Sequence, residues 1–260
     1  EASFRRFQRF SWWSRSLFSL FDMVCVQGEE FLERFRFLGV VENRLYKTGN
    51  LKWDQEEELL SAEKKREWAD RLGIEEEDVV LVAGSTHTGE EKAMIEAMLP
   101  LLRNNPKMKV VLVPRHPERF AEVATLLERQ PVVSMRWSVG KKVGAQLILV
   151  DTMGRLNHCY QLASLAFVGG SLYSGVGGHN IMEPCWVGVP VLFGPHMNSQ
   201  KEMVCLVLEV GAGAMVQLAD LPDTLSLWIN NEVIYRSAKK RGKKKKKQLK
   251  GSTDITWKTL

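Results

Sequence analysis

From Val79 onward, short apolar runs alternate with longer stretches in which apolar residues recur every three or four positions. The short runs predict buried strands, and the longer stretches predict helices that cover them. This alternation is typical of a parallel sheet with helices on its faces, so we predict an α/β fold with a Rossmann-like, doubly wound parallel sheet. The predicted strands are 79–83, 110–113, 132–135, 147–150, 165–168, 189–193 and 214–216, and the predicted helices are 90–103, 117–129, 155–162 and 200–209.

The first 50 residues predict the end of a second, smaller αβ domain, with a helix over 4–21, a strand over 22–27, a helix over 29–38 and a strand over 44–48. We therefore predict three parts: residues 1–48, a second domain over 49–238 that begins at a hinge at Gly49-Asn50 and a charged helical connector over 54–78, and residues 239–260. The stretch 4–21 mixes aromatic residues with arginines. It could contact a membrane interface or pack against the rest of its domain.

Composition is ordinary for a soluble globular protein, with 45% hydrophobic and 26% charged residues among 260. The net charge of +5 is concentrated in residues 239–250, which hold nine basic and no acidic residues and leave −4 for the rest. We predict a disordered basic tail over 239–260, with attraction to an anionic surface as the alternative.

Several function classes lack a signal. The four cysteines show no Cys-x-x-Cys spacing, no Asp-x-Asp or His-Glu-x-x-His motif occurs, and no nucleic-acid motif is present. No apolar run reaches the roughly 18 residues that span a bilayer. Because the chain begins at Glu1 rather than Met, we expect it to be internal to a longer product.

The sequence from Gly169 to Glu183 predicts a phosphate site, because five glycines follow a strand and open onto a helix near Asn180. Glycines let the backbone approach a ligand closely, and the first N–H groups of a helix attract anions. A carboxylate at Glu183 could face a ribose. The alternative is a long surface loop.

Three other strand ends carry polar residues. Arg115 follows a strand in Pro114-Arg115-His116-Pro117, where a guanidinium could clamp a phosphate or carboxylate or form a surface ion pair; His116 itself is more often structural. Ser85, Thr86 and His87 could cap a helix or contact a substrate. The segment 151–156, Asp-Thr-Met-Gly-Arg-Leu, is a weaker candidate for binding a base or phosphate.

Six motifs, taken in order, resemble those of the 3-deoxy-D-manno-octulosonic acid (Kdo) transferases. They are Gly49-Asn50-Leu51-Lys52-Trp53-Asp54, Gly84-Ser85-Thr86-His87-x-Gly89-Glu90-Glu91, Pro114-Arg115-His116-Pro117, Asp151-Thr152-Met153-Gly154, Gly178-His179-Asn180-Ile181-x-Glu183-Pro184 and Gly194-Pro195-His196. The resemblance covers about residues 1–235. It implies a GT-B glycosyltransferase that moves Kdo from CMP-Kdo to a lipid A precursor in lipopolysaccharide biosynthesis, with inversion and without a metal or other cofactor.

By this resemblance, Pro114 and Arg115 and the segment Gly154–Leu156 contact CMP, and Asn180–Glu183 hold the ribose and phosphate. The family usually has an acidic residue where this chain has Arg155. The donor-binding residues that we predict are Ser85, Thr86, Pro114, Arg115, Met153, Gly154, Arg155, Leu156, Gly178, His179, Asn180, Ile181, Met182 and Glu183.

The resemblance also implies that the catalytic base, a glutamate of the acceptor domain, lies upstream of residue 1, so no residue here is predicted to be that base. It implies peripheral membrane association, at the cytoplasmic face of the inner or plasma membrane in a bacterium or at a mitochondrial membrane in a plant. Two alternatives remain at this point: a GT-B enzyme that uses UDP-sugars, and a truncated nucleotide-binding module without catalytic activity.

Overall fold

The computed structural model describes residues 2–54 and 58–259 and divides the chain into two compact units. The smaller unit comprises residues 1–56 and 246–260, and the larger unit comprises 57–245. Residues 55–57, within the predicted connector, lie outside the described part.

The larger unit is built on one seven-stranded sheet in which every neighbouring pair of strands is parallel, in the order β5-β6-β4-β3-β7-β8-β9. The chain starts at the central strand β3, passes through β4 to the edge strand β5, returns to β6 between β5 and β4, and then crosses to the other side of β3 for β7, β8 and β9. This is the doubly wound topology that the alternation of patterns predicts. The strands are β3 (Val79–Thr86), β4 (Met108–Pro114), β5 (Ser134–Arg136), β6 (Leu147–Leu149), β7 (Leu165–Val168), β8 (Val191–Phe193) and β9 (Gly213–Met215).

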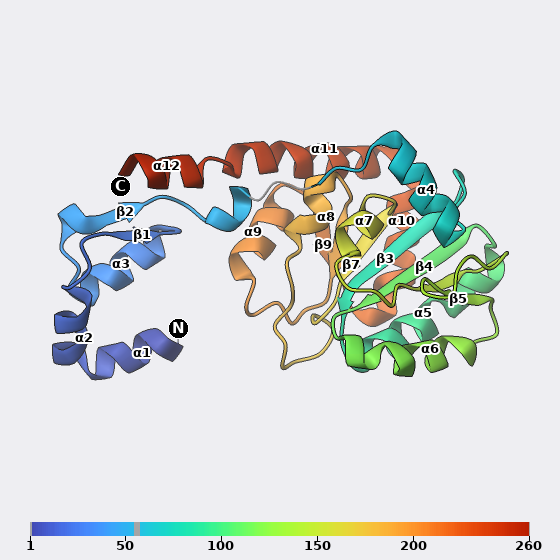
Figure 1. The fold of residues 1–260 in the computed structure, drawn as a ribbon, viewed down its shortest axis with the longest axis horizontal. Helices are drawn as coiled ribbons and strands as arrows, with labels where there is room; N and C mark the ends of the chain where they lie inside the picture. The colour runs from blue at the N-terminus through green and yellow to red at the C-terminus, as the bar shows by residue number, and fades with distance from the viewer. Residues whose placement is uncertain (1, 55–57, 260) are drawn as a thin grey trace. The chain divides into compact units, whose positions relative to one another are not determined.

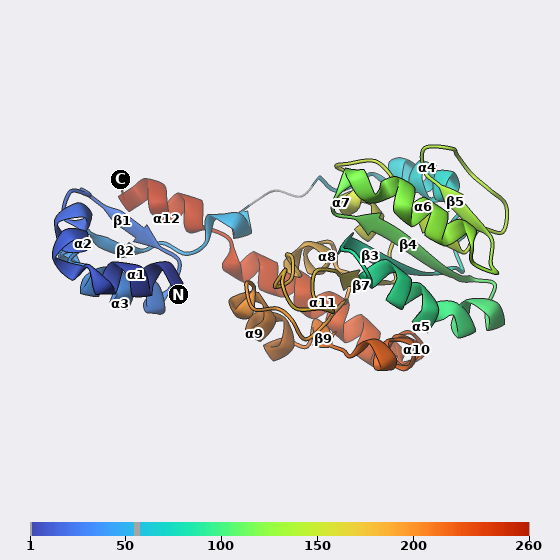
Figure 2. The same cartoon turned by 90° about the horizontal axis from the view of Figure 1, so that it is seen from below.

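Helices cover both faces of this sheet (Figures 1 and 2). On one face, α5, α6 and α10 pack on alternate residues of the central strands, including Leu81 and Leu112, in a fully buried core. On the other face lie α4 and α7. The helices of this unit are α4 (Ala62–Leu72), α5 (Glu90–Asn104), α6 (Phe120–Glu128), α7 (Leu156–Tyr160), α8 (Met182–Val187), α9 (Lys201–Glu209), α10 (Leu221–Asn230) and the first part of α11 (Glu232–Leu249), with short 3-10 turns at Pro117–Arg119 and Leu218–Asp220.

The smaller unit contains a two-stranded parallel sheet of β1 (Val24–Val26) and β2 (Leu45–Lys47). Its apolar core joins Val26, Val40 and Leu45, with Phe18 and Phe35 packed against it. The stretch predicted as one helix over 4–21 forms two, because the chain turns at Phe10 (φ −118°, ψ 49°). The helices are α1 (Ala2–Arg9), α2 (Ser11–Phe18), α3 (Glu29–Phe37) and α12 (Ser252–Thr259), with 3-10 turns at Glu42–Arg44 and Leu51–Asp54.

Two further parts of the predicted domain division can be compared with the structure. Gly49-Asn50, predicted as a hinge, stays within the smaller unit, where the backbone N–H of Gly49 donates to Val26 and the Asp54 carboxylate accepts from Gly251. The segment 239–260, predicted as a disordered tail, is described as the end of α11 and as α12. Lysine is a good helix former. Gly242 lets α11 pack closely against the backbone of Cys185 in α8, so the lysine-rich residues extend a helix that is already packed on the larger unit.

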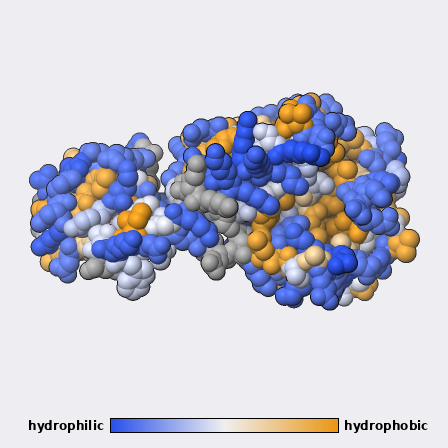
Figure 3. Space-filling model, turned by 90° about the horizontal axis from the view of Figure 1, so that it is seen from above, coloured by the Kyte–Doolittle hydropathy of each residue, from blue (hydrophilic) through white to orange (hydrophobic). Residues whose placement is uncertain are grey.

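Surface hydropathy varies over short distances on both units, with orange hydrophobic residues in patches between blue hydrophilic ones (Figure 3). Within the described part of the chain, no helix is both long enough and apolar enough to cross a bilayer.

Gly84 sets the distance between α7 and the sheet. A Cβ at this position would lie 2.2 Å from the Tyr160 hydroxyl oxygen and 2.5 Å from a methyl carbon of Leu156. Both partners are parts of α7, which starts immediately after the loop that follows β6. Replacing Gly84 would therefore displace one of the elements that line the carboxyl edge of the sheet.

We expect Gly84→Ala to lower the free energy of unfolding by about 1–3 kcal/mol, the usual cost of overpacking a close-packed contact. Thermal or urea unfolding measures this loss. Gly28→Ala is the control, because a methyl group there meets no atom within 4 Å. Equal stability of the Gly84→Ala variant and the unchanged chain would contradict the packing described.

Candidate functional site

The candidate site lies at the carboxyl edge of the seven-stranded sheet, where the loops after β3, β4, β6 and β7 begin. The order of the strands changes direction around β3, and ligands of open α/β sheets bind at such switch points. The backbone N–H of Arg115 donates to the Thr86 carbonyl at 3.0 Å, which joins the loops after β4 and β3. The site residues predicted on these two loops are thus brought together.

Glu90 is the residue that organises the glycine-rich loop. It is the first residue of α5 and is only 1% exposed. Its carboxylate accepts hydrogen bonds from four backbone N–H groups: His87 at 2.9 Å, Gly170 at 2.7 Å, Ser171 at 3.0 Å and Leu172 at 2.9 Å. One buried side chain therefore fixes both the loop after β3 and the start of the loop after β7.

Ser171 extends this framework toward β8. Its hydroxyl group donates to the Val168 carbonyl at 2.6 Å and accepts from the Gly194 N–H at 2.8 Å, while its own carbonyl accepts from the His196 N–H at 2.9 Å. Sequence reasoning assigned no role to Ser171 and considered Glu90 only within a helix start. An acid directly after a glycine at the start of a predicted helix was the available signal for Glu90.

At two positions of this loop, the backbone conformation and the close packing allow only glycine. Gly170 has a φ of +68°, and a Cβ there would lie 3.0 Å from the His179 ring. Gly178 has a φ of +82°, and a Cβ there would collide with the Met197 sulfur at 2.1 Å. The Gly178 N–H donates to the Gly170 carbonyl at 2.8 Å, so the loop folds back on itself.

Helix α8 follows this loop and begins at Met182, two residues later than the predicted start near Asn180. The Asn180 side chain accepts from the Met182 N–H at 3.0 Å and caps the helix from outside. Glu183 lies in the first turn and is close enough to Tyr160 of α7 to contribute to the raised pKa of that phenol, whose main cause is burial. The predicted segments 180–183 and 153–156 therefore lie on neighbouring elements.

Three histidines meet at this edge of the sheet. The Nε2 atoms of His87 and His179 are 2.7 Å apart and their rings are stacked, with centroids 5.0 Å apart, while His116 packs edge-on against His87. Burial, followed by the proximity of His87, Arg115 and His116, lowers the pKa of His179 to about 4. The pKa of His87 is also lowered, chiefly by burial.

Two polar groups at this edge lack a protein partner. The Arg115 side chain is exposed and, within residues 2–54 and 58–259, forms no hydrogen bond or ion pair. Thr86 Oγ1 is buried and has no hydrogen-bond partner in the same part of the chain. Ser85, between Gly84 and Thr86, has a φ of +54° and is the only described residue other than glycine with a positive φ. Unsatisfied groups and strained backbone of this kind gather at binding sites.

The loop after β6 is held by Asp151. Its carboxylate accepts from the Arg136 guanidinium at 3.0 Å, from the Ser138 N–H at 2.9 Å and from the Ser138 hydroxyl at 2.5 Å. Burial raises the pKa of Asp151, but the hydrogen bonds from Ser138 and Arg136 outweigh it, so the pKa lies below its ordinary value. Met153 and Gly154 are exposed beyond this anchor.

Arg155 is directed toward α4. Its guanidinium carbon lies 5.7 Å from the centre of the Trp68 ring, and Trp68 stacks on Trp137 at 4.5 Å. Its Nε atom is buried and has no hydrogen-bond partner among the described residues. The positive charge that sequence analysis placed beside the nucleotide is thus partly engaged by an aromatic stack.

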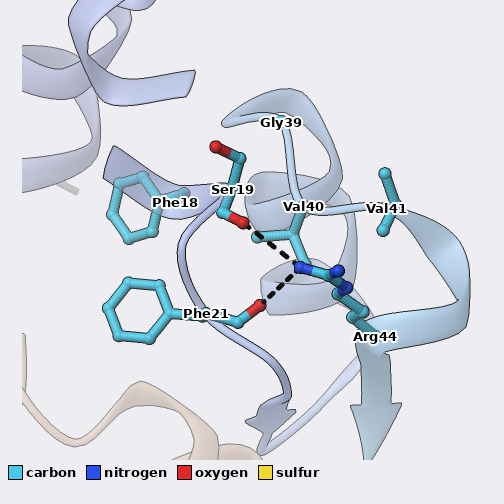
Figure 4. A pocket seen from close by; sticks show the side chains of 7 residues that line it. All are labelled: Phe18, Ser19, Phe21, Gly39, Val40, Val41 and Arg44. Carbon is cyan, nitrogen blue, oxygen red and sulfur yellow. Dashed lines mark hydrogen bonds between the residues drawn. The ribbon is translucent and has the colours of Figure 1, made fainter. Parts of the chain in front are cut away.

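A separate hollow of about 260 Å³ lies in the smaller unit, between Phe18, Phe21 and the segment 39–41 (Figure 4). Arg44 closes one side by donating to the carbonyls of Ser19 at 3.2 Å and Phe21 at 3.3 Å. None of the predicted donor-binding residues lines it. Within the described part of the chain, no group of three or more acidic, histidine or cysteine side chains could hold a metal ion.

We expect Glu90→Gln to lower the free energy of unfolding by about 2–4 kcal/mol, because an amide offers one oxygen to four buried N–H donors and turns its own NH₂ toward them. Urea unfolding measures the loss. Glu96→Gln, on the exposed face of the same helix, is the matched control and should change stability little. Equal effects of the two substitutions would contradict the role of Glu90.

We expect the stabilising effect of Asp151 to depend on pH. Because the folded pKa of Asp151 is lowered, its contribution is present above the unfolded pKa of about 3.9 and is lost as pH falls through the folded value. Urea unfolding at several pH values should therefore show a difference between the chain and Asp151→Asn that is large at pH 7 and shrinks toward pH 3. Asp70→Asn, with an exposed carboxylate, is the control. A difference that stays constant would contradict this prediction.

Comparison with known proteins relates both units to one family. A family model described as 3-deoxy-D-manno-octulosonic-acid transferase (kdotransferase) matches residues 1–55. The 3-deoxy-D-manno-octulosonic acid transferase of Chlamydia trachomatis serovar A is 32% identical over 261 residues, which cover 100% of this chain and 60% of that protein. The Haemophilus influenzae transferase of the same name is 34% identical over 200 residues, 75% of this chain and 46% of that protein. The whole of this chain thus aligns with about 60% of the length of the Chlamydia transferase.

Among solved structures, the C-terminal CMP-Kdo binding domain of WaaA from Acinetobacter baumannii is similar with a TM-score of 0.66 and 29% identity, over 70% of this chain and 95% of that domain. HepE from Anabaena in complex with UDP is similar in fold alone, with a TM-score of 0.57 and 13% identity over 91% of this chain and 62% of that protein. The predicted α/β fold of the GT-B type is confirmed. The resemblance found from the six motifs is likewise confirmed, and the chain belongs to the family of 3-deoxy-D-manno-octulosonic acid transferases.

Proposed function

We propose that this chain provides the donor-binding part of a glycosyltransferase that moves Kdo from CMP-Kdo to a lipid A precursor in lipopolysaccharide biosynthesis. The observation that carries the proposal is the meeting of four loops at the switch point of the sheet. They bring three features to one edge: Arg115, whose side chain has no partner among the described residues, the glycine-rich loop and the start of α8. The relationship to Kdo transferases supports CMP-Kdo as the donor.

Within this proposal each loop has a part. The guanidinium of Arg115 neutralises the donor phosphate and stabilises the charge that grows on CMP as the glycosidic bond breaks. The loop at Gly154 and the adjoining start of α7 lie where a base could rest, and Asn180–Glu183 face the ribose and phosphate. Glu90 contacts no ligand in this scheme; it holds the loop in place before the donor arrives.

Catalysis without a metal and with inversion is part of the proposal. The positive charge that the departing phosphate needs would come from Arg115 and from backbone N–H groups. No described residue is given the role of the catalytic base. A UDP-sugar enzyme is less favoured, since the UDP-bound neighbour resembles this chain in fold only, at 13% identity.

Peripheral membrane association is also proposed, because the acceptor is a lipid and the smaller unit carries basic residues beside exposed aromatic ones. In α1 and α2, Trp12 is 76% exposed and Trp13 is 50% exposed, and four arginines lie in the same stretch. Such a mixture suits the headgroup region of an anionic membrane. The cytoplasmic face of a bacterial inner membrane is the location we propose; a mitochondrial membrane is the alternative for a plant protein.

Calorimetric titration of the chain with CMP and with UDP, each with and without Mg²⁺, tests the proposal. We expect CMP to bind more tightly than UDP and Mg²⁺ to make no difference. Arg115→Ala should weaken CMP binding by about 1.5–3 kcal/mol through the loss of a charge-assisted hydrogen bond. Arg129→Ala, an exposed arginine at the end of α6, is the matched control. Preference for UDP, or an unchanged affinity of Arg115→Ala, would contradict the proposal.

A further inference from the structure

The Nε2 atoms of His87 and His179 face each other in the site, and only one proton fits between them. Their Nε2 atoms are 2.7 Å apart, a hydrogen-bond distance that requires a proton on one nitrogen and a lone pair on the other. Two N–H groups would repel one another, and so would two lone pairs. In the absence of a ligand the pair is therefore a donor and an acceptor in contact, with both rings neutral at pH 7.

Burial is the main cause of the lowered pKa of both rings, and the cations around the pair lower it further. On the loops beside it lie the cations of Arg115 and Arg119 and the ring of His116. The two carboxylates nearby are already engaged: Glu90 accepts from four backbone N–H groups, and Glu91 forms a two-pronged ion pair with Arg119 at 2.7 and 3.0 Å. The protein thus surrounds the imidazole pair with positive charge and with acids that have other partners.

An arriving oxyanion would change this balance. A phosphate beside Arg115 adds the negative charge that the pair lacks, and it offers oxygen acceptors for an Nε2–H from each ring. Both rings can donate only if the pair takes up a proton or changes its tautomer. Uptake is favoured because an imidazolium beside a phosphate is stabilised by charge as well as by its hydrogen bond.

We propose that His87 and His179 bind the phosphate of the nucleotide donor as a pair, and that binding opens their mutual hydrogen bond and takes up one proton from solvent. The two histidines then become specificity-determining residues that couple donor affinity to pH. The inference rests on the proposed CMP-binding function. It adds that binding of the nucleotide is coupled to the uptake of one proton by the histidine pair.

The sign of the effect follows from the two states. The pair is neutral without ligand and protonated with it, so binding takes up a proton and affinity rises as pH falls. For one linked proton, the dissociation constant changes by up to about tenfold per pH unit. CMP also loses its second phosphate proton near pH 6, so each comparison must be made between variants with the same ligand.

The experiment is calorimetric titration with CMP at pH 6, 7 and 8, in two buffers with different ionisation enthalpies, which reports the number of protons taken up. We compare the unchanged chain with His87→Gln, His179→Gln and the double variant, whose glutamines keep hydrogen-bonding groups without the titratable ring. His158→Gln, on α7 and outside the histidine group, is the control. Cytidine and inorganic phosphate are titrated in parallel. Thermal unfolding of each variant shows that it is folded.

We expect proton uptake near one at pH 7 with CMP, and a steeper gain in affinity toward pH 6 for the unchanged chain and His158→Gln than for the histidine-pair variants. With cytidine we expect no uptake, because it has no phosphate; uptake with cytidine would overturn the inference. Inorganic phosphate is expected to show the same linkage at lower affinity.

CMP binding with the same pH slope in all variants would also overturn the inference while leaving the proposed nucleotide function intact. Absence of CMP binding at every pH would contradict both.

Discussion

The buried carboxylate of Glu90 is the interaction on which the candidate site depends. A glycine-rich loop has little stability of its own, because glycine loses more conformational freedom on folding than any other residue. Here one acid accepts four backbone N–H groups from two loops on neighbouring strands. A charged acceptor with all its bonding capacity used inside the protein is strongly stabilising in place and costly to disturb. The loop is therefore held in shape without a ligand.

The rest of the edge follows from this anchor. Ser171 links the end of β7 to the loop after β8 through hydrogen bonds to Val168 and Gly194. Asp151 fixes the loop after β6, and Gly84 lets α7 lie directly on the sheet. Among the described residues, the Arg115 side chain and Thr86 Oγ1 at this edge have no hydrogen-bond partner, and the Nε2 atoms of His87 and His179 are hydrogen-bonded to each other. The groups with protein partners hold the loops in place, and we propose that the groups without partners contact the ligand.

Much of the fold could be predicted because hydrophobic periodicity reports burial. Strand β7 was predicted with its exact bounds and α5 to within one residue, since both have clear patterns and sharp ends. The helix predicted over 4–21 was wrong in being continuous, because the chain turns at Phe10 and the rings of Phe7 in α1 and Phe18 in α2 meet edge-on at 5.2 Å, a contact that helical periodicity does not reveal. The basic segment 239–260, predicted as a disordered tail, is described as helical, and its composition hides the small residues, such as Gly242, that face α8.

The candidate site was predictable in position rather than in detail. Residues at strand ends must meet at one edge of a parallel sheet, which gave Arg115 and the glycine-rich loop. The partners of Glu90 and Asp151 and the pairing of His87 with His179 could not be predicted, because they join residues up to 92 positions apart and depend on loop conformations. Whether the residues predicted to hold the donor do so stays a prediction.

The most direct test of a preformed donor site is a crystal structure of this chain with CMP bound. We expect the nucleotide to lie across the loops after β3, β4, β6 and β7, with its phosphate next to Arg115. We also expect the N–H groups of Gly170, Ser171 and Leu172 still to donate to Glu90. A nucleotide bound elsewhere, or a loop that releases Glu90 to accept the ligand, would contradict it.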